Sequence, residues 1–397
     1  MVERGGAQTD ENLPGRRLGF GRVLVAENLR PAVLVDPDRL HAGTISHMQA
    51  AELTRLAEEL GLDAVGAAPA SAYEETERHI RERRARGLFG EMRFTMAQPE
   101  VSCHPETLLE GARTVVSAAL CYWLEGEEPP PGHGRLPRYT WWDAYSELRE
   151  RLDELGRRIN DLAGKAAETS QTASQATPQG GEYRVLVDAN QHVDREAAAR
   201  SGVGFYGKNT MLITRRHGSW VVLGTLVTTA ELEATPALDA GCGSCTLCID
   251  ACPTDALEEA GVLDATRCLS YWTQSADPFP EEYREALGDR VYGCDICQDV
   301  CPWNRGVEKR RAGDPGTRSV VSEPHVSLVD WLEADDAELA ERYDRLFVPR
   351  NDPRYLRRNA LVALGNAGGD PALAEAYAVS DDPLLREHAE WALRRLR

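Results

Sequence analysis

Two runs of closely spaced cysteines carry the most recognisable chemistry in this sequence. The first run has the spacing C-x2-C-x2-C-x3-C-P and consists of Cys242, Cys245, Cys248 and Cys252, with Pro253 after it. The second run is a partial copy that also ends in a proline, and it consists of Cys294, Cys297 and Cys301. A further cysteine, Cys268, lies between the two runs. The spacing of the first run is that of bacterial ferredoxins, in which the thiolates bind [4Fe–4S] clusters.

These eight cysteines divide into two complete sets of four cluster ligands. In two-cluster ferredoxins the fourth cysteine of each run binds the cluster of the other run. This rule predicts one cluster held by Cys242, Cys245, Cys248 and Cys301. It predicts a second cluster held by Cys252, Cys294, Cys297 and, in place of the missing first cysteine, Cys268. A pair of structural zinc sites is the alternative, since these also use C-x2-C pairs, but the three-plus-one spacing and the prolines favour iron.

The charge balance argues against one class of function and leaves a related one open. The chain has 45 Lys and Arg against 64 Asp and Glu, a net charge of −19. A protein that coats nucleic acid through a general basic field is therefore not expected. A local basic site is compatible with this balance, because arginines follow the second cysteine run and cluster again at residues 350–358.

Cysteine usage and hydropathy favour a reducing, cytoplasmic location. Eight of the ten cysteines have metal-ligand spacing, so a disulfide framework is not expected in a chain of 397 residues. The pair Arg16-Arg17 resembles the start of an export signal, but polar residues and a proline interrupt every apolar run that follows it. No stretch approaches the length needed to cross a membrane. Residues 1–45 are interpreted as a loosely packed extension.

The elements that must position the cysteines alternate between helices and strands ahead of the first run. Apolar periodicity predicts a helix over residues 46–60, capped by Ser46 and ended by Gly61, and a second over 145–163. The second carries one apolar stripe, made of Leu148, Leu152, Leu155, Ile159 and Leu162. A charged helix is expected over 76–86 and a short one over 193–200. Short apolar runs predict strands over residues 62–68, 114–123, 183–187 and 220–229. An exposed loop is expected over 125–137, and the composition of 165–181 predicts a flexible insertion. The alternation predicts an α/β layer structure for residues 46–240.

The end of the chain has a different character. The segment that starts at Tyr355 is followed 29 residues later by a similar segment that starts at Leu384. Both copies place small residues at helix-packing positions, and the period is that of a short helical repeat. Two copies cannot form a free-standing solenoid, so this tail is expected to pack on the rest of the protein.

A carboxylate at the end of a predicted strand is the candidate for acid–base chemistry. Asp188 ends the apolar strand 183–187, and a carboxylate at this position of an α/β domain points toward the usual ligand crevice. A cap for the helix 193–200 is the alternative role. The glycines of residues 202–210 allow a bulky ligand to approach the backbone, although their spacing is not that of a dinucleotide site. Cys103 and Cys121 lie outside the cluster sets, and Cys121 is interpreted as a small core residue.

Together these segments resemble the epoxyqueuosine reductase family, cobalamin-dependent iron–sulfur enzymes of transfer RNA modification. The match is carried by Val187-Asp188, by Ala-Arg-Ser-Gly-Val-Gly-Phe-Tyr-Gly-Lys-Asn-Thr at 199–210, by the cysteine array, and by Leu-Arg-Arg-Asn-Ala-Leu-Val-Ala-Leu-Gly-Asn at 356–366. It extends from about residue 46 to the end of the chain. The chain departs from the family where Ala189-Asn190-Gln191 follows Asp188 and where Ser146 follows Tyr145.

The resemblance implies a fold and a domain organisation. It implies an α/β cobalamin-binding domain over residues 46–240, followed by a ferredoxin-like module with two [4Fe–4S] clusters over 241–305. A connecting segment over 306–345 then leads to an all-α, HEAT-like repeat tail over 346–397. The cobalamin contacts that it implies are Asp188, Lys208, Asn209, Thr210, Leu212, Leu223, Ser270 and Tyr271.

The resemblance also implies the reaction. The family reduces epoxyqueuosine to queuosine at the wobble position of tRNA with a GUN anticodon. Removal of the epoxide oxygen needs two electrons that side chains cannot supply, so cofactors must provide them. Asp188 falls on the family's catalytic acid, and burial beside the corrinoid would raise its pKa and allow it to donate a proton. The expected partners are the tRNA and a low-potential donor of the flavodoxin or ferredoxin type, with no membrane partner, and the protein is expected to be a monomer.

Two alternative functions are considered, together with a hypothesis about the surface that binds tRNA. A reductive dehalogenase-like corrinoid enzyme acting on a small molecule uses the same ferredoxin chemistry, and an iron–sulfur electron-transfer subunit would need no catalytic site. The size of the α/β domain argues against the second. For tRNA, we expect one basic face made of Arg305, Arg310, Arg311, Arg354, Arg357 and Arg358. The alternative is that these arginines pair with acidic residues on the surface of the tail itself.

Overall fold

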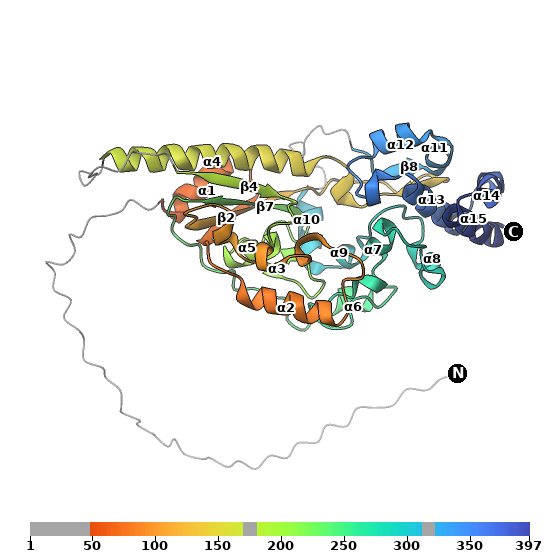
Figure 1. The fold of residues 1–397 in the computed structure, drawn as a ribbon, viewed down its shortest axis with the longest axis horizontal. Coiled ribbons are helices and arrows are strands. Elements are labelled where there is room, and N and C mark those ends of the chain that lie inside the picture. Colours follow the sequence, from red (N-terminus) through yellow and green to blue (C-terminus); the bar gives the residue numbers. More distant parts are fainter. Residues whose placement is uncertain (1–47, 170–180, 312–321) are drawn as a thin grey trace, which may run out of the picture. The chain divides into compact units, whose positions relative to one another are not determined.

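The computed structural model describes residues 48–169, 181–311 and 322–397 of the chain (Figure 1). The expected extension over 1–45, the cap at Ser46 and most of the expected insertion over 165–181 lie outside these residues. No helix in the described ranges is both long and apolar enough to cross a membrane.

A four-stranded sheet forms the centre of the α/β part. The strands lie in the order β1-β2-β7-β4, and they span Ala64–Pro69, Thr114–Cys121, Val221–Thr228 and Tyr183–Val187. Every pairing is antiparallel, with Ala119 opposite both Ala64 and Leu223, and Val187 opposite Gly224. The expected layer structure is therefore present. However, the argument that Asp188 points toward a ligand crevice applies to parallel sheets, and this sheet is antiparallel. The two middle strands, β2 and β7, are buried along their full length.

Helices cover both faces of this sheet. Helices α1 (Ala50–Glu59) and α4 (Ala144–Thr169) lie on one face, and α2 (Glu74–Ala85), α3 (Pro99–Ser102) and α5 (Asp194–Arg200) lie on the other (Figure 1). The apolar stripe predicted for α4 is confirmed, because its first four members, Leu148, Leu152, Leu155 and Ile159, are buried against the sheet. Helix α4 continues to Thr169 and so enters the segment expected to be a flexible insertion. Gly61 ends the first helix as expected, with a φ of 68° that favours glycine.

The cysteine module follows the sheet and contains only short helices. These are α6 (Leu247–Asp250), α7 (Leu269–Gln274), α8 (Glu281–Leu287) and α9 (Ile296–Asp299), and α10 (Pro302–Arg311) begins directly after the last cysteine. Short helices leave many backbone N–H groups without an intrahelical partner, because the first four of each helix have none. This architecture therefore offers donors to the sulfur atoms that lie at the helix starts.

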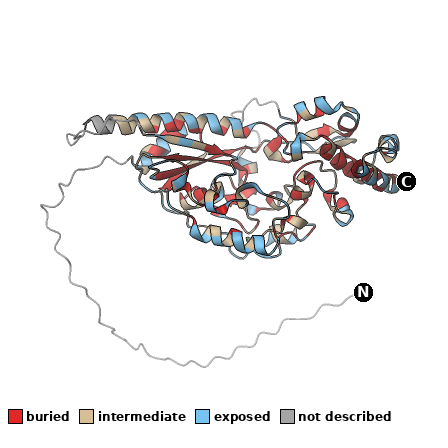
Figure 2. Ribbon diagram, viewed as in Figure 1, coloured by how far each residue is buried: buried red, intermediate tan, exposed pale blue. Residues whose placement is uncertain are grey.

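The tail is helical and packs on the module. It consists of α13 (Arg354–Ala367), α14 (Pro371–Ala378) and α15 (Pro383–Leu396). Two helices of the expected connecting segment, α11 (Leu328–Glu333) and α12 (Asp336–Arg342), pack beside it. Helix α13 lies at its centre and is buried on nearly all sides (Figure 2). The backbone N–H of Phe279 donates to Nε2 of His388 at 3.1 Å, which joins α15 to the module. The loop expected over 125–137 contains β3 (His133–Arg135), which pairs with β8 (His325–Ser327) beside the tail.

Two arginines of the expected basic face lie inside the protein. Arg358 is fully buried and donates to the backbone carbonyls of Trp272, Ser275 and Asp277, each at 2.7 Å. Arg357 is also buried and forms an ion pair with Asp336. The expectation that they contact RNA phosphates from an exposed face is therefore wrong. Sequence composition shows where arginines cluster but not which of them the tail uses to bind its own backbone.

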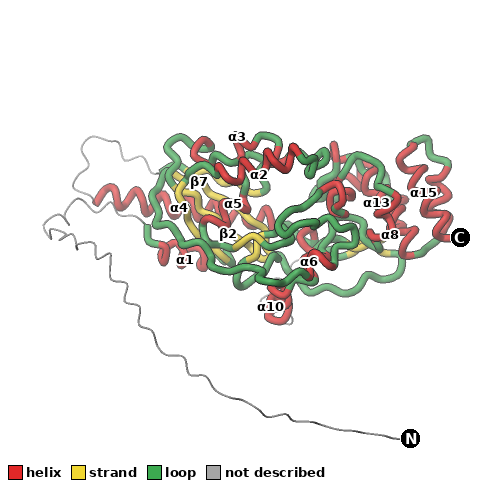
Figure 3. The backbone as a smooth tube through the Cα atoms, turned by 90° about the horizontal axis from the view of Figure 1, so that it is seen from below, coloured by secondary structure: helices red, strands yellow, loops and turns green. Residues whose placement is uncertain are grey.

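The remaining members do not complete a single face either. Arg354 pairs with Asp352 at 3.1 Å, and Arg311 lies 3.4 Å from Asp63. Helix α10, which carries Arg305 and Arg310, lies beside the sheet, whereas α13 lies among the tail helices (Figures 1 and 3). The pairing of Arg354 and Arg357 with acidic residues agrees with the alternative stated for the tail.

The position of Arg358 leads to a stability prediction. Replacing Arg358 by methionine removes its charge-assisted hydrogen bonds to three carbonyls and to Oδ1 of Asn359 and leaves buried acceptors unsatisfied, so unfolding should become easier by about 2 kcal/mol or more. A lower temperature of thermal unfolding would report this loss. The matched control is Arg305→Met, because the exposed guanidinium of Arg305 has no hydrogen bond or ion pair within the described parts of the chain. Equal unfolding temperatures for the two variants would contradict the structural role of Arg358.

Candidate iron–sulfur and active site

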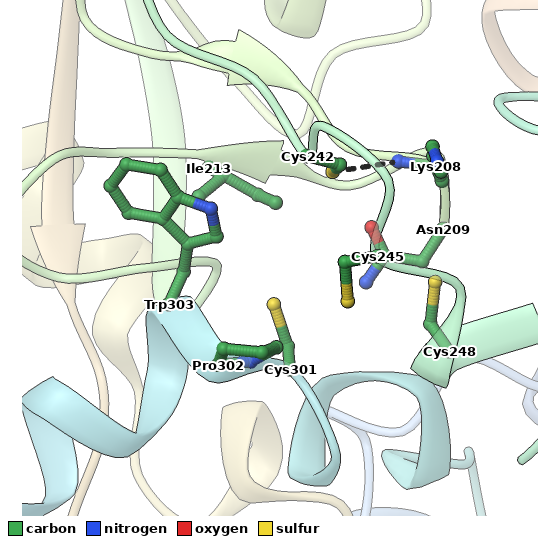
Figure 4. Close-up of a pocket in the computed structure, with 9 residues that line it drawn as sticks. All are labelled: Lys208, Asn209, Ile213, Cys242, Cys245, Cys248, Cys301, Pro302 and Trp303. Carbon is green, nitrogen blue, oxygen red and sulfur yellow. Dashed lines mark hydrogen bonds between the residues drawn. The ribbon is translucent and has the colours of Figure 1, made fainter. Parts of the chain in front are cut away.

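Four cysteines from the two runs line one cavity of about 140 Å³. They are Cys242, Cys245, Cys248 and Cys301, and their sulfur atoms face a common space (Figure 4). The structure thus brings together the set that the crossing rule predicts. Within residues 48–169, 181–311 and 322–397, no three His, Cys, Asp or Glu side chains gather as a single metal ion would require.

Backbone N–H groups surround the sulfur atoms of this cavity. The N–H of Lys208 donates to Sγ of Cys242 at 3.5 Å, and Nζ of Lys208 donates to the carbonyl of Gly243 at 2.8 Å. Burial raises the pKa of Cys301, and the N–H groups of Trp303 and Asn304 at the start of α10 lower it. Thiolates gain stability from such N–H donors and from the positive end of a helix dipole. The cavity can therefore hold thiolates bound to an iron–sulfur cluster.

Electrostatic interactions link the other four cysteines. Burial raises the pKa of Cys297, and negative charge on Cys294 and Cys268 raises it further. Cys252 contributes in the same way to the raised pKa of Cys268, after burial. The isolated Cys268 is the N-cap residue of α7, where the N–H groups of Ser270 and Tyr271 point to its sulfur and lower its pKa. Its position at a helix start matches that of Cys301.

Asp188 lies directly after β4, at the end of the sheet that faces the module. Its φ of 51° is in the left-handed region, which a residue other than glycine adopts only where its surroundings hold it. Burial raises the pKa of Asp188, and the positive charge of Arg149 opposes this rise. Nη2 of Arg149 donates to the carbonyl of Val187 at 2.7 Å, so the same guanidinium also fixes the end of β4.

Tyrosine and carboxyl side chains gather around Asp188. Tyr206 keeps 44 % of its surface exposed, yet burial raises its pKa. Burial likewise raises the pKa of the partly exposed Tyr145 and Asp194, and the charge of Asp188 adds to both rises. We call the region of these four residues the recess. Its residues come from α4, the end of β4, α5 and the hairpin of β5 (Phe205–Tyr206) and β6 (Leu212–Ile213).

The residues expected to contact cobalamin divide between this recess and the cysteines. Lys208 and Asn209, in the turn of the β5–β6 hairpin, line the cysteine cavity. The carbonyl of Thr210 accepts from Nη1 of Arg195 at 3.2 Å, which places it at the recess. Leu212 and Leu223 are buried in the core. Ser270 and Tyr271 lie beside Cys268, and the hydroxyl of Tyr271 accepts from the N–H of Glu91 at 3.1 Å.

Several residues of the recess have no counterpart among the candidates chosen from the sequence. These residues are Arg149, Asp194 and Tyr206. Of the three, Arg149 could have been found from the sequence. Tyr145 and Arg149 are four residues apart on the predicted helix, so they occupy one face of it, and Tyr145 stands in the segment already compared with the family. The two cysteines outside the cluster sets, Cys103 and Cys121, are both buried, as expected for Cys121.

Family models match two segments of the chain. One described as a 4Fe–4S double cluster binding domain matches residues 241–304, and one described as epoxyqueuosine reductase QueG, DUF1730 matches residues 103–189. An epoxyqueuosine reductase of Lactococcus garvieae is 33 % identical over 87 % of this chain and 95 % of its own length. One of Pseudomonas aeruginosa is 34 % identical over 94 % of this chain and 98 % of its own length.

Solved structures agree with these matches. The structure of epoxyqueuosine reductase from Streptococcus thermophilus is 28 % identical, with a TM-score of 0.73 over 87 % of this chain and 90 % of that one. A crystal structure of an epoxyqueuosine reductase with an epoxyqueuosine-modified tRNA-Tyr stem loop has a TM-score of 0.72 and 28 % identity over 87 % of this chain and 89 % of that one. A further structure, from Bacillus subtilis, is described with the loop of its catalytic aspartate swung out of the active site.

The fold and the site define an iron–sulfur oxidoreductase in which a [4Fe–4S] double-cluster domain adjoins an α/β domain with an acidic recess. The chain belongs to the epoxyqueuosine reductase family.

Proposed function

We propose that this protein reduces epoxyqueuosine to queuosine in transfer RNA. One observation carries the proposal: the family relationship extends over nearly the whole chain and includes both the cysteine module and the strand end with Asp188. The expected substrate is a tRNA with a GUN anticodon that carries epoxyqueuosine. A dehalogenase-like enzyme and an electron carrier without a catalytic site are both disfavoured by this relationship.

The cofactor assignments follow from the positions of the side chains. We assign one [4Fe–4S] cluster to Cys242, Cys245, Cys248 and Cys301, and the other to Cys252, Cys268, Cys294 and Cys297. The recess fits a large polar cofactor because its walls are tyrosines and partly exposed polar groups, and we assign it to cobalamin. When bound, clusters and cobalamin supply the two low-potential electrons that epoxide deoxygenation requires.

The protein's own groups then act on the substrate. Asp188 would hold a proton at its carboxyl group and donate it to the oxygen that leaves the epoxide. Its raised pKa favours the protonated form that this role requires. Arg149 keeps the end of β4, and with it Asp188, in place. Tyr145 and Tyr206 would line the walls that limit the access of water to the reacting carbons.

The domain boundaries follow the same division. Residues 46–240 would form the cobalamin-binding domain, 241–305 the cluster module, 306–345 the connection and 346–397 a HEAT-like tail. The donor of electrons would be a flavodoxin or a ferredoxin in the cytoplasm, acting on a monomer. It would approach the loop of Cys245, where Ser244, Thr246 and Leu247 are exposed next to the first cluster.

The test of the function uses the full chain with both clusters and cobalamin, prepared without oxygen. An anticodon stem loop that carries epoxyqueuosine is supplied with reduced flavodoxin, and in a parallel reaction with dithionite. Mass spectrometry should show the loss of one oxygen atom from the modified nucleoside in both reactions. Unchanged RNA with both donors, from protein that contains its full complement of iron and cobalt, would exclude the proposed activity.

Arg149 offers a prediction about pH. An acid that donates a proton works below its pKa, so turnover should fall as the pH rises through the pKa of Asp188. Because the charge of Arg149 lowers that pKa, Arg149→Met should raise it and move the alkaline fall in rate to higher pH. Arg149→Lys retains the charge and serves as the control. Single-turnover rates across a pH series check this, and an identical alkaline limb for Met and Lys would refute the electrostatic link.

A further inference from the structure

Two exposed phenylalanines form a pair on the surface of the protein. Phe94 is 37 % exposed and Phe347 is 53 % exposed, and their rings meet edge to face with centroids 5.5 Å apart. Phe94 begins the short helix η2 (Phe94–Met96) of the α/β part, and Phe347 precedes the helix η6 (Pro349–Asn351) at the entry to the tail. Large aromatic side chains that gather at the surface instead of the core mark sites of interaction.

The backbone at this pair is held in an unfavourable conformation. Phe94 has a φ of 28° and Arg350 a φ of 59°, both in the region that favours glycine. Neither residue is a glycine, and strain of this kind persists mainly at binding and catalytic sites. The strain thus accompanies the exposed rings on both of the segments that carry them.

The charges beside the pair are not used within the protein. Arg93 and Arg350 are exposed, and neither guanidinium makes a hydrogen bond or an ion pair with any described residue. Nearby arginines differ, since Arg345 pairs with Glu323 at 2.6 Å and Arg354 pairs with Asp352. Each exposed ring therefore has, within three residues of it in the sequence, an arginine that pairs with none of the described residues.

Hydrogen bonds also attach both rings beside the cysteine module. The hydroxyl of Tyr292 donates to the carbonyl of Phe347 at 2.9 Å. The N–H of Glu91, three residues before Phe94, donates to the hydroxyl of Tyr271 at 3.1 Å. Tyr271 is one of the residues expected to contact cobalamin, so the segment that carries Phe94 is attached to the expected cofactor site.

We propose that Phe94 and Phe347 form a platform on which an unpaired base of the anticodon loop stacks, beside the modified base that enters the recess. Arg93 and Arg350 contact the phosphates on either side of the stacked base. This inference rests on the proposed function and names part of its RNA contact. Proteins recognise single-stranded RNA by aromatic rings that stack on splayed bases and by arginines that neutralise the backbone.

A comparison of two probes tests the platform. The variant is Phe347→Leu in the full chain with its cofactors, and the matched control is Val379→Ala, because Val379 is 82 % exposed on the tail away from any aromatic pair. One probe is the epoxyqueuosine stem loop, and the others are the same RNA with an abasic nucleotide at each position that adjoins the modified one. Phe347→Leu should bind the intact probe roughly 5- to 100-fold more weakly, as expected for the loss of one stacked base. One of the abasic probes should bind the parent protein as weakly as the intact probe binds Phe347→Leu. The affinity of that abasic probe should fall little further when the variant replaces the parent.

Salt dependence separates the rings from the arginines. Arg93→Gln and Arg350→Gln should each flatten the slope of log affinity against log salt by about 0.7, whereas Phe347→Leu should leave the slope unchanged. Parental affinity of Phe347→Leu for the intact probe would overturn the platform and leave the proposed function standing. Normal RNA binding with slower reduction by flavodoxin would mean that the pair contacts a protein, which also overturns it. A parent that binds none of the RNA probes would overturn both proposals.

Discussion

Asp188→Asn should lower the turnover of epoxyqueuosine in RNA by roughly 10²- to 10⁴-fold, the usual contribution of a positioned proton donor. Asparagine has nearly the same size and retains hydrogen bonding, but its amide cannot donate a carboxylic proton. The left-handed backbone at this position also tolerates asparagine better than most residues. The measurement is the single-turnover rate with dithionite, so that electron supply from a protein donor does not limit it.

The control for this prediction is a second carboxylate in the same recess. Burial raises the pKa of Asp194 as it does that of Asp188, but Asp194 begins α5 whereas Asp188 directly follows β4. Asp194→Asn should therefore change the rate far less, and both variants should bind cobalt and RNA like the parent. A large loss in Asp194→Asn with a parental rate in Asp188→Asn would transfer the proton-donor role to Asp194.

The meeting of four cysteines in one cavity could be predicted from sequence because their pattern is local. A ferredoxin run fixes three ligands within a few residues, and the crossing rule supplies the fourth, so the meeting of Cys301 with Cys242 needed no knowledge of the fold. Helix α4 was found for the same reason, since its apolar stripe repeats along one segment. The strand β4 matches its predicted bounds, residues 183–187.

Features that depend on pairing between distant segments could not be read in this way. All strand pairs of the four-stranded sheet are antiparallel. An alternation of helices and strands along the sequence does not show whether the strands pair in parallel or antiparallel. The recess is similar, because Tyr145, Asp188 and Tyr206 come from three separate elements. Even its acid was located by strand position and by resemblance, without its partner Arg149.

The arginines of the tail show a different limit. Local charge density indicated an RNA surface at residues 354–358, yet α13 is the central helix of the tail and Arg358 binds carbonyls within the last turn of α7 and just after it. The sequence carried one sign of this, since the small and apolar residues of 360–365 leave no polar face on that part of the helix. A helix without a polar face is buried, and an arginine within it must satisfy buried acceptors.

Removal of Cys268 should abolish one cluster and leave the other intact. Each [4Fe–4S] cluster contributes four irons, so the parent should contain about eight irons per chain and Cys268→Ala about four. Cys301→Ala should also leave about four, but the surviving cluster should be the other one, because Cys301 lines the cavity of Cys242 and Cys268 does not line it. Iron analysis and electron paramagnetic resonance of the reduced proteins would measure the number and the identity of the clusters.

A third cysteine provides the control for these variants. Cys103 is buried in a separate apolar cluster on the face of the sheet that α2 and α5 cover. Cys103→Ala should therefore retain about eight irons. The decisive comparison is between the two ligand variants: distinct resonance spectra, each with half the iron, require that Cys268 and Cys301 serve different clusters. Identical spectra would mean that the two cysteines serve one cluster and that the crossing assignment is wrong. Full iron in Cys268→Ala would show that this residue, despite its place at the start of α7, is not a ligand.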